Sequence, residues 1–83
     1  MRLDKYLKVS RLIKRRTVAN EACDGGRVTV NGKVARASYD VKIGDVIALL
    51  FGERTLAVEV LDVSETAGKS VASLLYREVP AQD

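Results

Sequence analysis

The sequence contains no histidine and no tryptophan, and only one cysteine and one proline among its 83 residues. Without histidine, the chain can form neither a Ser-His-Asp triad nor an imidazole base. A single cysteine excludes an internal disulfide framework and favours a reducing compartment. The sequence also lacks a Cys and His cluster with metal-ligand spacing and any glycine-rich nucleotide loop. We therefore expect a protein that is not an enzyme and that uses neither a cofactor nor a metal.

Long apolar stretches are missing as well. No apolar run approaches the roughly 18–20 residues that cross a bilayer. Charges are interleaved with apolar side chains at the N-terminus, so the uninterrupted apolar region of a signal peptide is lacking. We expect a cytoplasmic protein without membrane contact, folded as one domain over residues 1–83. Aromatic residues make up only 5%, so the core must consist of Val, Leu, Ile and Ala.

Positive charge is abundant, and it is concentrated near the N-terminus. Seven of the 14 Lys and Arg residues lie between Arg2 and Arg16, where Asp4 is the single acid. Residues 1–20 therefore carry a charge of +6 (seven basic, one acidic), whereas residues 21–83 carry −3 (seven basic, ten acidic). A basic pole on an acidic body is typical of a protein that binds a polyanion. The alternative is a solvated helix face, although such faces usually mix both signs.

Apolar spacing predicts a first helix over residues 2–8. Leu3, Tyr6 and Leu7 follow one another at i, i+3 and i+4, which places them on one side of a helix. Ser10 then caps a short turn, because serine competes for backbone hydrogen bonds.

A second short helix is predicted to begin at Thr17, whose side chain is a good N-cap. Ala19, Ala22 and Cys23 form its inner side, and a glycine pair at 25–26 ends it with one residue at positive φ. Cys23 belongs to the core in this interpretation, because it shares helical spacing with Ala19 and the chain has no histidine to activate a catalytic thiol.

The remainder of the chain is predicted to form a small sheet. Residues 27–30 alternate polar and apolar side chains, and the following Asn31-Gly32 pair is a strong hairpin pattern. The apolar run at 46–51 suits a strand that is buried on both faces. Residues 55–63 alternate cleanly and are predicted to form a long edge strand.

The C-terminal part is less regular. Residues 71–75 suit either a short helix or a last strand, with the helix favoured, and 76–79 are expected to be extended. The predicted fold class is α+β, with two or three short N-terminal helices packed on a mostly antiparallel, curled sheet of four to five strands.

RNA is a better expected partner than DNA. A recognition helix in the major groove of DNA must present side chains that contact bases. The second predicted helix presents Val18, Asn20, Glu21 and Asp24 outward, and two of these are acidic. A short basic head suits phosphate and shape recognition of structured RNA.

Several motifs occur together in a familiar order. They are RLDKYL, a basic residue followed by Thr at the entry to the second helix, GRVTVNGK, and a D-x-K-x-G-D turn. In these motifs, residues 2–51 resemble the S-four-type RNA-binding domain, also called the αL motif, with residues 52–83 as an extension. The later LLYRE segment is similar to the stand-alone members of that family, the RqcP-like proteins of ribosome-associated quality control and a related heat-shock protein.

This resemblance implies a monomer that binds the large ribosomal subunit and contacts both ribosomal RNA and peptidyl-tRNA. It also implies a partner, RqcH, which such proteins help to add a C-terminal alanine tail to stalled nascent chains. One departure from the family pattern is the CDGG segment at 23–26, which replaces the more usual apolar-plus-Lys/Ala-Gly lead-in to the GRV strand and removes a possible basic contact. The residues expected to bind RNA, by charge or by position in the module, are Arg2, Lys5, Arg11, Lys14, Arg15, Arg16, Thr17 and Asn20, with Lys33 and Lys42 at the rim.

The sequence alone leaves three other functions open. A heat-shock-type recycling factor for the large subunit has the same module. The module also precedes the catalytic domain of RNA-modifying enzymes, so an RNA-binding accessory to such an enzyme is a further alternative. A protein-interaction adaptor would instead use the predicted edge strand at 55–63, because an unpaired edge offers free backbone groups.

Overall fold

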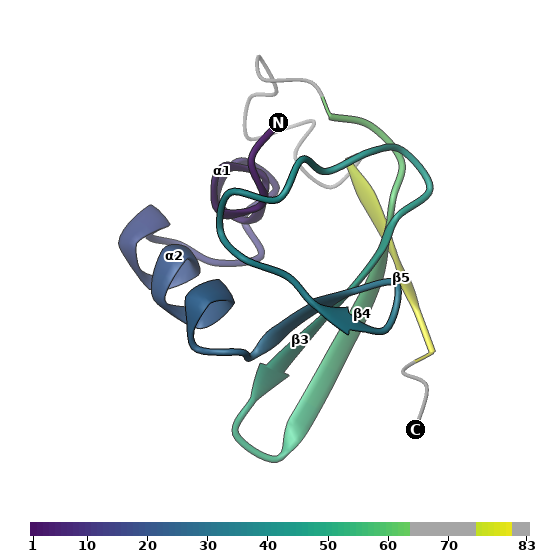
Figure 1. Cartoon of the computed structure of the whole chain (residues 1–83). Coiled ribbons are helices and arrows are strands. Elements are labelled where there is room, and N and C mark those ends of the chain that lie inside the picture. The colour runs from purple at the N-terminus through teal and green to yellow at the C-terminus, as the bar shows by residue number, and fades with distance from the viewer. Residues whose placement is uncertain (64–74, 81–83) are drawn as a thin grey trace.

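The computed structural model describes residues 1–63 and 75–80 (Figure 1). Two helices are followed by an antiparallel sheet with the strand order β2-β1-β3-β4-β5. This arrangement confirms the predicted α+β class. The elements are α1 (Leu3–Val9), α2 (Arg16–Asp24), β1 (Val28–Val30), β2 (Lys33–Val34), β3 (Val46–Phe51), β4 (Arg54–Val60) and β5 (Tyr76–Val79). The predicted helix at 71–75 falls mostly on 71–74, outside the described residues.

The core lies between the helices and one face of the curled sheet. Leu3, Tyr6 and Leu7 are fully buried, as the helical spacing predicted. From α2, Ala19 and Cys23 are buried, while Ala22 is partly exposed. The sheet contributes the buried side chains Val28, Val30, Ile47, Leu49, Val58 and Val60. Among the described helices, none has the length and hydropathy needed to span a membrane.

The N-cap of the second helix lies two residues earlier than predicted. Arg15 is its N-cap, with an extended backbone at φ −120° and ψ 132°, and its carbonyl accepts from the Ala19 N–H at 3.0 Å. Thr17 therefore lies inside the first turn and is not the N-cap, because the extended conformation falls at Arg15. The other end agrees with the prediction: Gly26 has φ +80°, and the Arg27 N–H bonds back to the Ala22 carbonyl at 2.9 Å.

The first hairpin is confirmed. Asn31 and Gly32 both have positive φ, at 54° and 85°, which is the type I′ geometry that suits a two-residue connection. They join β1 to β2 in the register Val30↔Lys33.

Two predictions about the sheet are wrong. In β3, Ile47 and Leu49 are buried but Leu50 and Phe51 are exposed, because the helices that the structure describes, α1 and α2, cover only one face of the sheet. The predicted edge strand, β4, is an interior strand, because β5 pairs with its far side. The edges of the sheet are β2 and β5. The adaptor hypothesis, which required a free edge at 55–63, therefore loses its basis.

Candidate nucleic-acid interface

Asp4 lies at the centre of the basic helical head, which consists of α1, α2 and the turn between them. Its side chain is buried, and its carboxylate accepts hydrogen bonds from the Lys5 N–H at 2.8 Å and from Arg2 Nε at 3.2 Å. The second helix contributes Asn20, whose Nδ2 donates at 3.2 Å, and Arg16, whose Nε lies 3.5 Å away. One carboxylate thus joins both helices and holds two arginines beside each other.

The two arginines remain available to a ligand. The side chains of Arg2 and Arg16 are 51% and 48% exposed, although each contacts Asp4. A guanidinium has five N–H donors, so an arginine that contacts a carboxylate with one or two of them keeps others for a phosphate. Asp4 therefore orients these side chains without covering them.

Hydrogen bonding keeps Asp4 ionised. Burial alone raises the pKa of this carboxyl group, but the hydrogen bonds from Asn20, Arg2 and the Lys5 N–H, together with the charge of Arg16, outweigh burial. The net result is a pKa below the ordinary value of 3.8. At neutral pH the group is a carboxylate that attracts both arginines.

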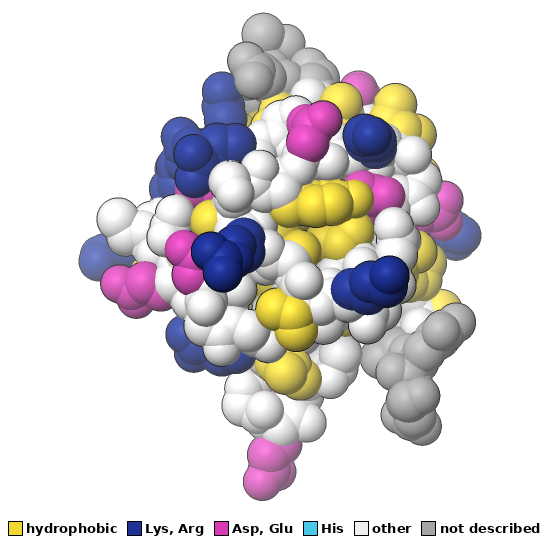
Figure 2. All heavy atoms as spheres, viewed as in Figure 1, with side chains coloured by type: hydrophobic (Ala, Val, Ile, Leu, Met, Phe, Trp, Pro, Cys, Tyr) yellow, Lys and Arg dark blue, Asp and Glu magenta, His cyan; other side chains and the backbone are white. Residues whose placement is uncertain are grey.

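Further basic side chains surround this centre. Arg11, Lys14 and Arg15 are exposed in the turn between the helices, and Lys5 is half-buried on α1. Figure 2 shows Lys and Arg side chains gathered on the side of the molecule where α1 and α2 lie. A shallow hollow between the helices is lined by Asp4, Arg16, Thr17, Asn20 and Glu21.

Two polar residues of α2 have roles that the sequence did not reveal. Asn20, expected to face RNA, donates its amide to Asp4 and so helps to position the arginines. Asp24, expected to face outward, accepts from the Ala37 N–H at 3.1 Å and ties α2 to the loop after β2. Asp4 itself was missed as a site residue, although it is the single acid within the basic run.

The rim lysines lie apart from the Asp4 centre. Lys33 is exposed on β2, and Lys42 is exposed in the loop before β3. That loop is organised by Asp45, which accepts from the Lys42 N–H at 3.0 Å, Tyr39 Oη at 2.9 Å and Asn31 Nδ2 at 3.1 Å. The structure therefore divides the predicted site residues into a group around the two helices and a pair of lysines on β2 and the loop before β3.

The described residues offer little for metal binding or thiol chemistry. They include no group of three or more Cys, Asp or Glu side chains placed to hold a metal ion. Cys23 is buried, and burial, with the nearby Asp4 and Asp24 charges, raises the pKa of its thiol to about 11. The thiol is therefore protonated at neutral pH, which agrees with its predicted place in the core.

Comparison with known families identifies the class. The model of the S4 domain matches residues 1–47, which include both helices and the first hairpin. The chain belongs to the S4-domain family.

Curated relatives narrow this assignment. The RQC P-site tRNA stabilizing factor of Halalkalibacterium halodurans is 58% identical over 92% of this chain and 86% of its own length. Its namesake in Bacillus subtilis is 51% identical over 92% of this chain and 88% of its own length. Within the S4 domains, the chain belongs to the family of the RQC P-site tRNA stabilizing factors.

A solved structure shares the fold as well. The trimeric structure of Vibrio cholerae Heat Shock Protein 15 superposes with a TM-score of 0.86 at 36% identity, covering 95% of this chain and 81% of that one.

Proposed function

We propose that this chain is a non-catalytic RNA-binding factor of the large ribosomal subunit that contacts ribosomal RNA and the P-site tRNA. The observation that carries the proposal is the Asp4 centre, which places two half-exposed arginines side by side, one at the N-cap of α1 and one at the start of α2. The names of the curated relatives support the same partner, because they describe stabilizers of P-site tRNA.

The geometry suits recognition of a structured RNA backbone. Arg2 and Arg16 are held in place before binding, so little side-chain freedom is lost when they contact phosphates. The exposed Arg11, Lys14 and Arg15 extend the positive surface around the turn between the helices. Contacts of this kind read shape and phosphate spacing more than base sequence.

The finer role proposed for the chain is in ribosome-associated quality control. There it would act as a monomer beside RqcH and support the addition of alanine to a stalled nascent chain. Stabilising the P-site tRNA is a role that binding alone performs, which is consistent with a factor that has no catalytic step of its own. Alanine tailing reconstituted with purified large subunits, peptidyl-tRNA and RqcH tests this role. Tailing that is equally efficient without the chain would contradict it.

Co-sedimentation with large subunits tests the binding surface. Replacing Arg2, Arg15 and Arg16 by alanine should abolish co-sedimentation while the circular dichroism spectrum stays that of a folded protein. Arg54→Ala, which removes an exposed arginine from the far end of the sheet, is the matched control and should sediment like the wild type. If the triple variant sedimented with subunits as well as the control, the proposed surface would be wrong.

A second candidate function is a heat-shock-type recycling factor, which the fold of Heat Shock Protein 15 favours. The two functions differ in their dependence on RqcH. A quality-control factor should bind subunits carrying peptidyl-tRNA more tightly than empty ones when RqcH is present. A preference that does not depend on RqcH would favour recycling.

A further inference from the structure

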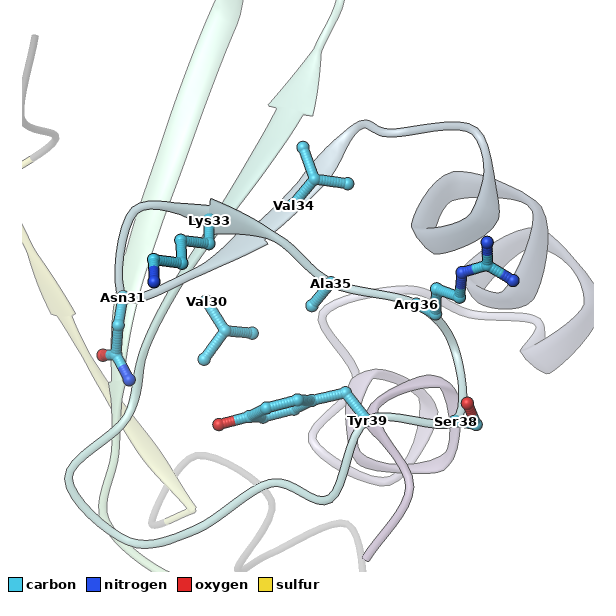
Figure 3. Close-up of a pocket in the computed structure, with 8 residues that line it drawn as sticks. All are labelled: Val30, Asn31, Lys33, Val34, Ala35, Arg36, Ser38 and Tyr39. Carbon is cyan, nitrogen blue, oxygen red and sulfur yellow. The ribbon is translucent and has the colours of Figure 1, made fainter.

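A hollow of about 660 Å³ opens beside the first hairpin, away from the Asp4 centre. Figure 3 shows the ring of Tyr39 along one side of it, with Val30 and Ala35 opposite the ring and Lys33 and Arg36 at separate parts of the rim. In the space-filling view, a hydrophobic patch is visible at the centre of this face, with both basic and acidic side chains around it (Figure 2). The hollow is lined by Val30, Asn31, Lys33, Val34, Ala35, Arg36, Ser38 and Tyr39.

Hydrogen bonds hold Tyr39 both at its side-chain hydroxyl and at its backbone. Its hydroxyl donates to Asp45 at 2.9 Å, and its backbone carbonyl accepts from the Leu3 N–H at 2.8 Å. Its own N–H bonds to the Arg36 carbonyl at 3.0 Å. The ring is therefore held in position before any ligand arrives, which reduces the entropy lost on binding.

The charge around the hollow favours an anionic ligand. Lys33 and Arg36 are exposed, and neither forms an ion pair within residues 1–63 and 75–80. The nearby acids are already engaged: Asp45 accepts three hydrogen bonds, Asp24 accepts from the Ala37 N–H at 3.1 Å, and Asp40 pairs with the N-terminal ammonium group at 2.8 Å. A phosphate at the rim therefore meets two unpaired cations.

The hollow is connected to the helical RNA surface. The loop that lines it is bonded to the start of α1, where the Ala37 and Tyr39 carbonyls accept from the N–H groups of Asp4 and Leu3 at 3.2 and 2.8 Å. This is the turn of α1 that also carries the carboxylate between the two arginines. The loop that lines the hollow and the Asp4 centre are therefore held by the same turn of the protein.

We propose that this hollow binds one unpaired nucleotide of the RNA, with its base against Tyr39 and its phosphates between Lys33 and Arg36. The proposal rests on the proposed RNA-binding function and adds a ligand class to it. A recessed aromatic side chain cannot reach a base that is stacked inside a helix, whereas an unpaired base can enter a hollow and contact the ring. Base contacts of this kind are sequence-tolerant, because every base has a π-face.

Two RNA probes test the proposal: a hairpin with an unpaired loop, and a blunt duplex with the same stem. Fluorescence anisotropy on the full chain gives the affinity for each. Tyr39→Leu should weaken hairpin binding by about 10-fold or more, in the range measured for base–aromatic contacts, and leave duplex binding unchanged. Tyr39→Phe keeps the ring and should bind within about twofold of the wild type. Tyr76→Leu, the same change on β5, is the matched control and should bind both probes like the wild type.

A cross-link provides a readout that does not depend on the stability of a variant. A hairpin with 5-iodouridine at one loop position should cross-link to wild-type Tyr39 on irradiation, as located by mass spectrometry. Hairpin affinity unchanged in Tyr39→Leu, or a cross-link only to other residues, would overturn the hollow as a nucleotide site. If Arg16→Ala still weakened duplex binding in that case, the proposed RNA-binding function would stand. Absence of wild-type binding to large subunits and to both probes would refute that function itself.

Discussion

At the scale of single residues, Asp4 is the acid on which the proposed interface depends. Like charges repel, so Arg2 and Arg16 would not stay side by side without a negative group between them. Asp4 supplies that group, and the hydrogen bonds from Asn20 and the Lys5 N–H compensate for its burial. The acid in the basic run therefore strengthens the positive surface by fixing its geometry.

Replacing this carboxylate tests its positioning role. Asp4→Asn removes the charge and turns one acceptor oxygen into a donor, which faces Arg2 or Asn20 unfavourably. We expect a loss of about 1–3 kcal/mol in the free energy of unfolding, measured by urea denaturation. RNA affinity should also fall, although no cation has been removed. Asp40→Asn, which changes an exposed acid of the same charge, is the control. If Asp4→Asn bound RNA like Asp40→Asn, the positioning role would be excluded.

Asp4 and Asp45 also predict how stability depends on pH. Burial raises the pKa of each, but hydrogen bonds outweigh it, so both pKa values lie below 3.8 in the folded protein. A carboxyl group whose pKa is lowered by folding contributes stability that is present above its unfolded pKa and is lost as pH falls through the folded pKa. The free energy of unfolding should therefore fall below about pH 4. In Asp4→Asn and Asp45→Asn this acid-induced loss should be smaller, as urea titrations at several pH values would show. An equally steep loss in both variants would assign it to other groups.

At the scale of elements, the first hairpin links the sheet to the loop that carries Tyr39 and Lys42. Asn31 supplies the positive φ of the turn, and its amide reaches across to the start of β3. Its Nδ2 donates to Asp45 at 3.1 Å, and its Oδ1 accepts from the Val46 N–H at 3.0 Å. One side chain thus fixes both the turn and the loop.

Asn31→Asp tests this link. The aspartate would retain the acceptor for the Val46 N–H but would place a second carboxylate beside Asp45. We expect a loss of about 1–2 kcal/mol at pH 7, which should diminish in acid as one carboxyl group is protonated. Asn31→Gly tolerates the positive φ and loses both hydrogen bonds without adding charge. In urea denaturation at several pH values, the loss in Asn31→Asp should therefore shrink in acid more than the loss in Asn31→Gly, and an equal pH dependence in the two variants would show that repulsion from Asp45 is unimportant.

Local sequence patterns predicted the helices and the hairpin better than they predicted which elements pack on a strand or pair with it. The i, i+3, i+4 spacing found α1, and the Asn31-Gly32 pair found the first hairpin, because both depend on residues close in sequence. The covered face of β3 depends on how many helices pack on the sheet, and its six consecutive apolar residues do not contain that information. The position of β4 depends on β5, a four-residue strand with a weak pattern.

The candidate site shows the same difference between features set by local sequence and features set by packing. Runs of Lys and Arg indicated the helical surface, whereas the part played by Asp4 depends on Asn20, 16 residues away in sequence. A lone acid within a basic run suggests a solvated side chain until the second helix is packed against it. The aromatic hollow was also missed, because Tyr39 comes together with Lys33 and Val30 only when the hairpin and the following loop have folded.

At the scale of the whole molecule, charge is separated between the helices and the sheet. Residues 1–20 carry +6 and the remaining residues carry −3. A polyanion therefore attracts one side of the molecule and is repelled by acids elsewhere, which orients the protein before contact. The acidic body also disfavours binding to RNA in other orientations.

This separation predicts how affinity for large subunits depends on salt. Each phosphate contact releases counterions, so the slope of log K against log salt changes by about 0.7–0.9 for each contact. Replacing Arg2, Arg15 and Arg16 by alanine should make the slope shallower by about 2–3, whereas Arg54→Ala should leave it unchanged. Binding to subunits labelled at one site, measured from about 50 to 300 mM KCl, gives the slopes. A variant that lost affinity at constant slope would indicate that these arginines support the fold. A shallower slope in a variant that is still folded at the assay temperature would identify them as phosphate contacts, because lost counterion release changes the slope.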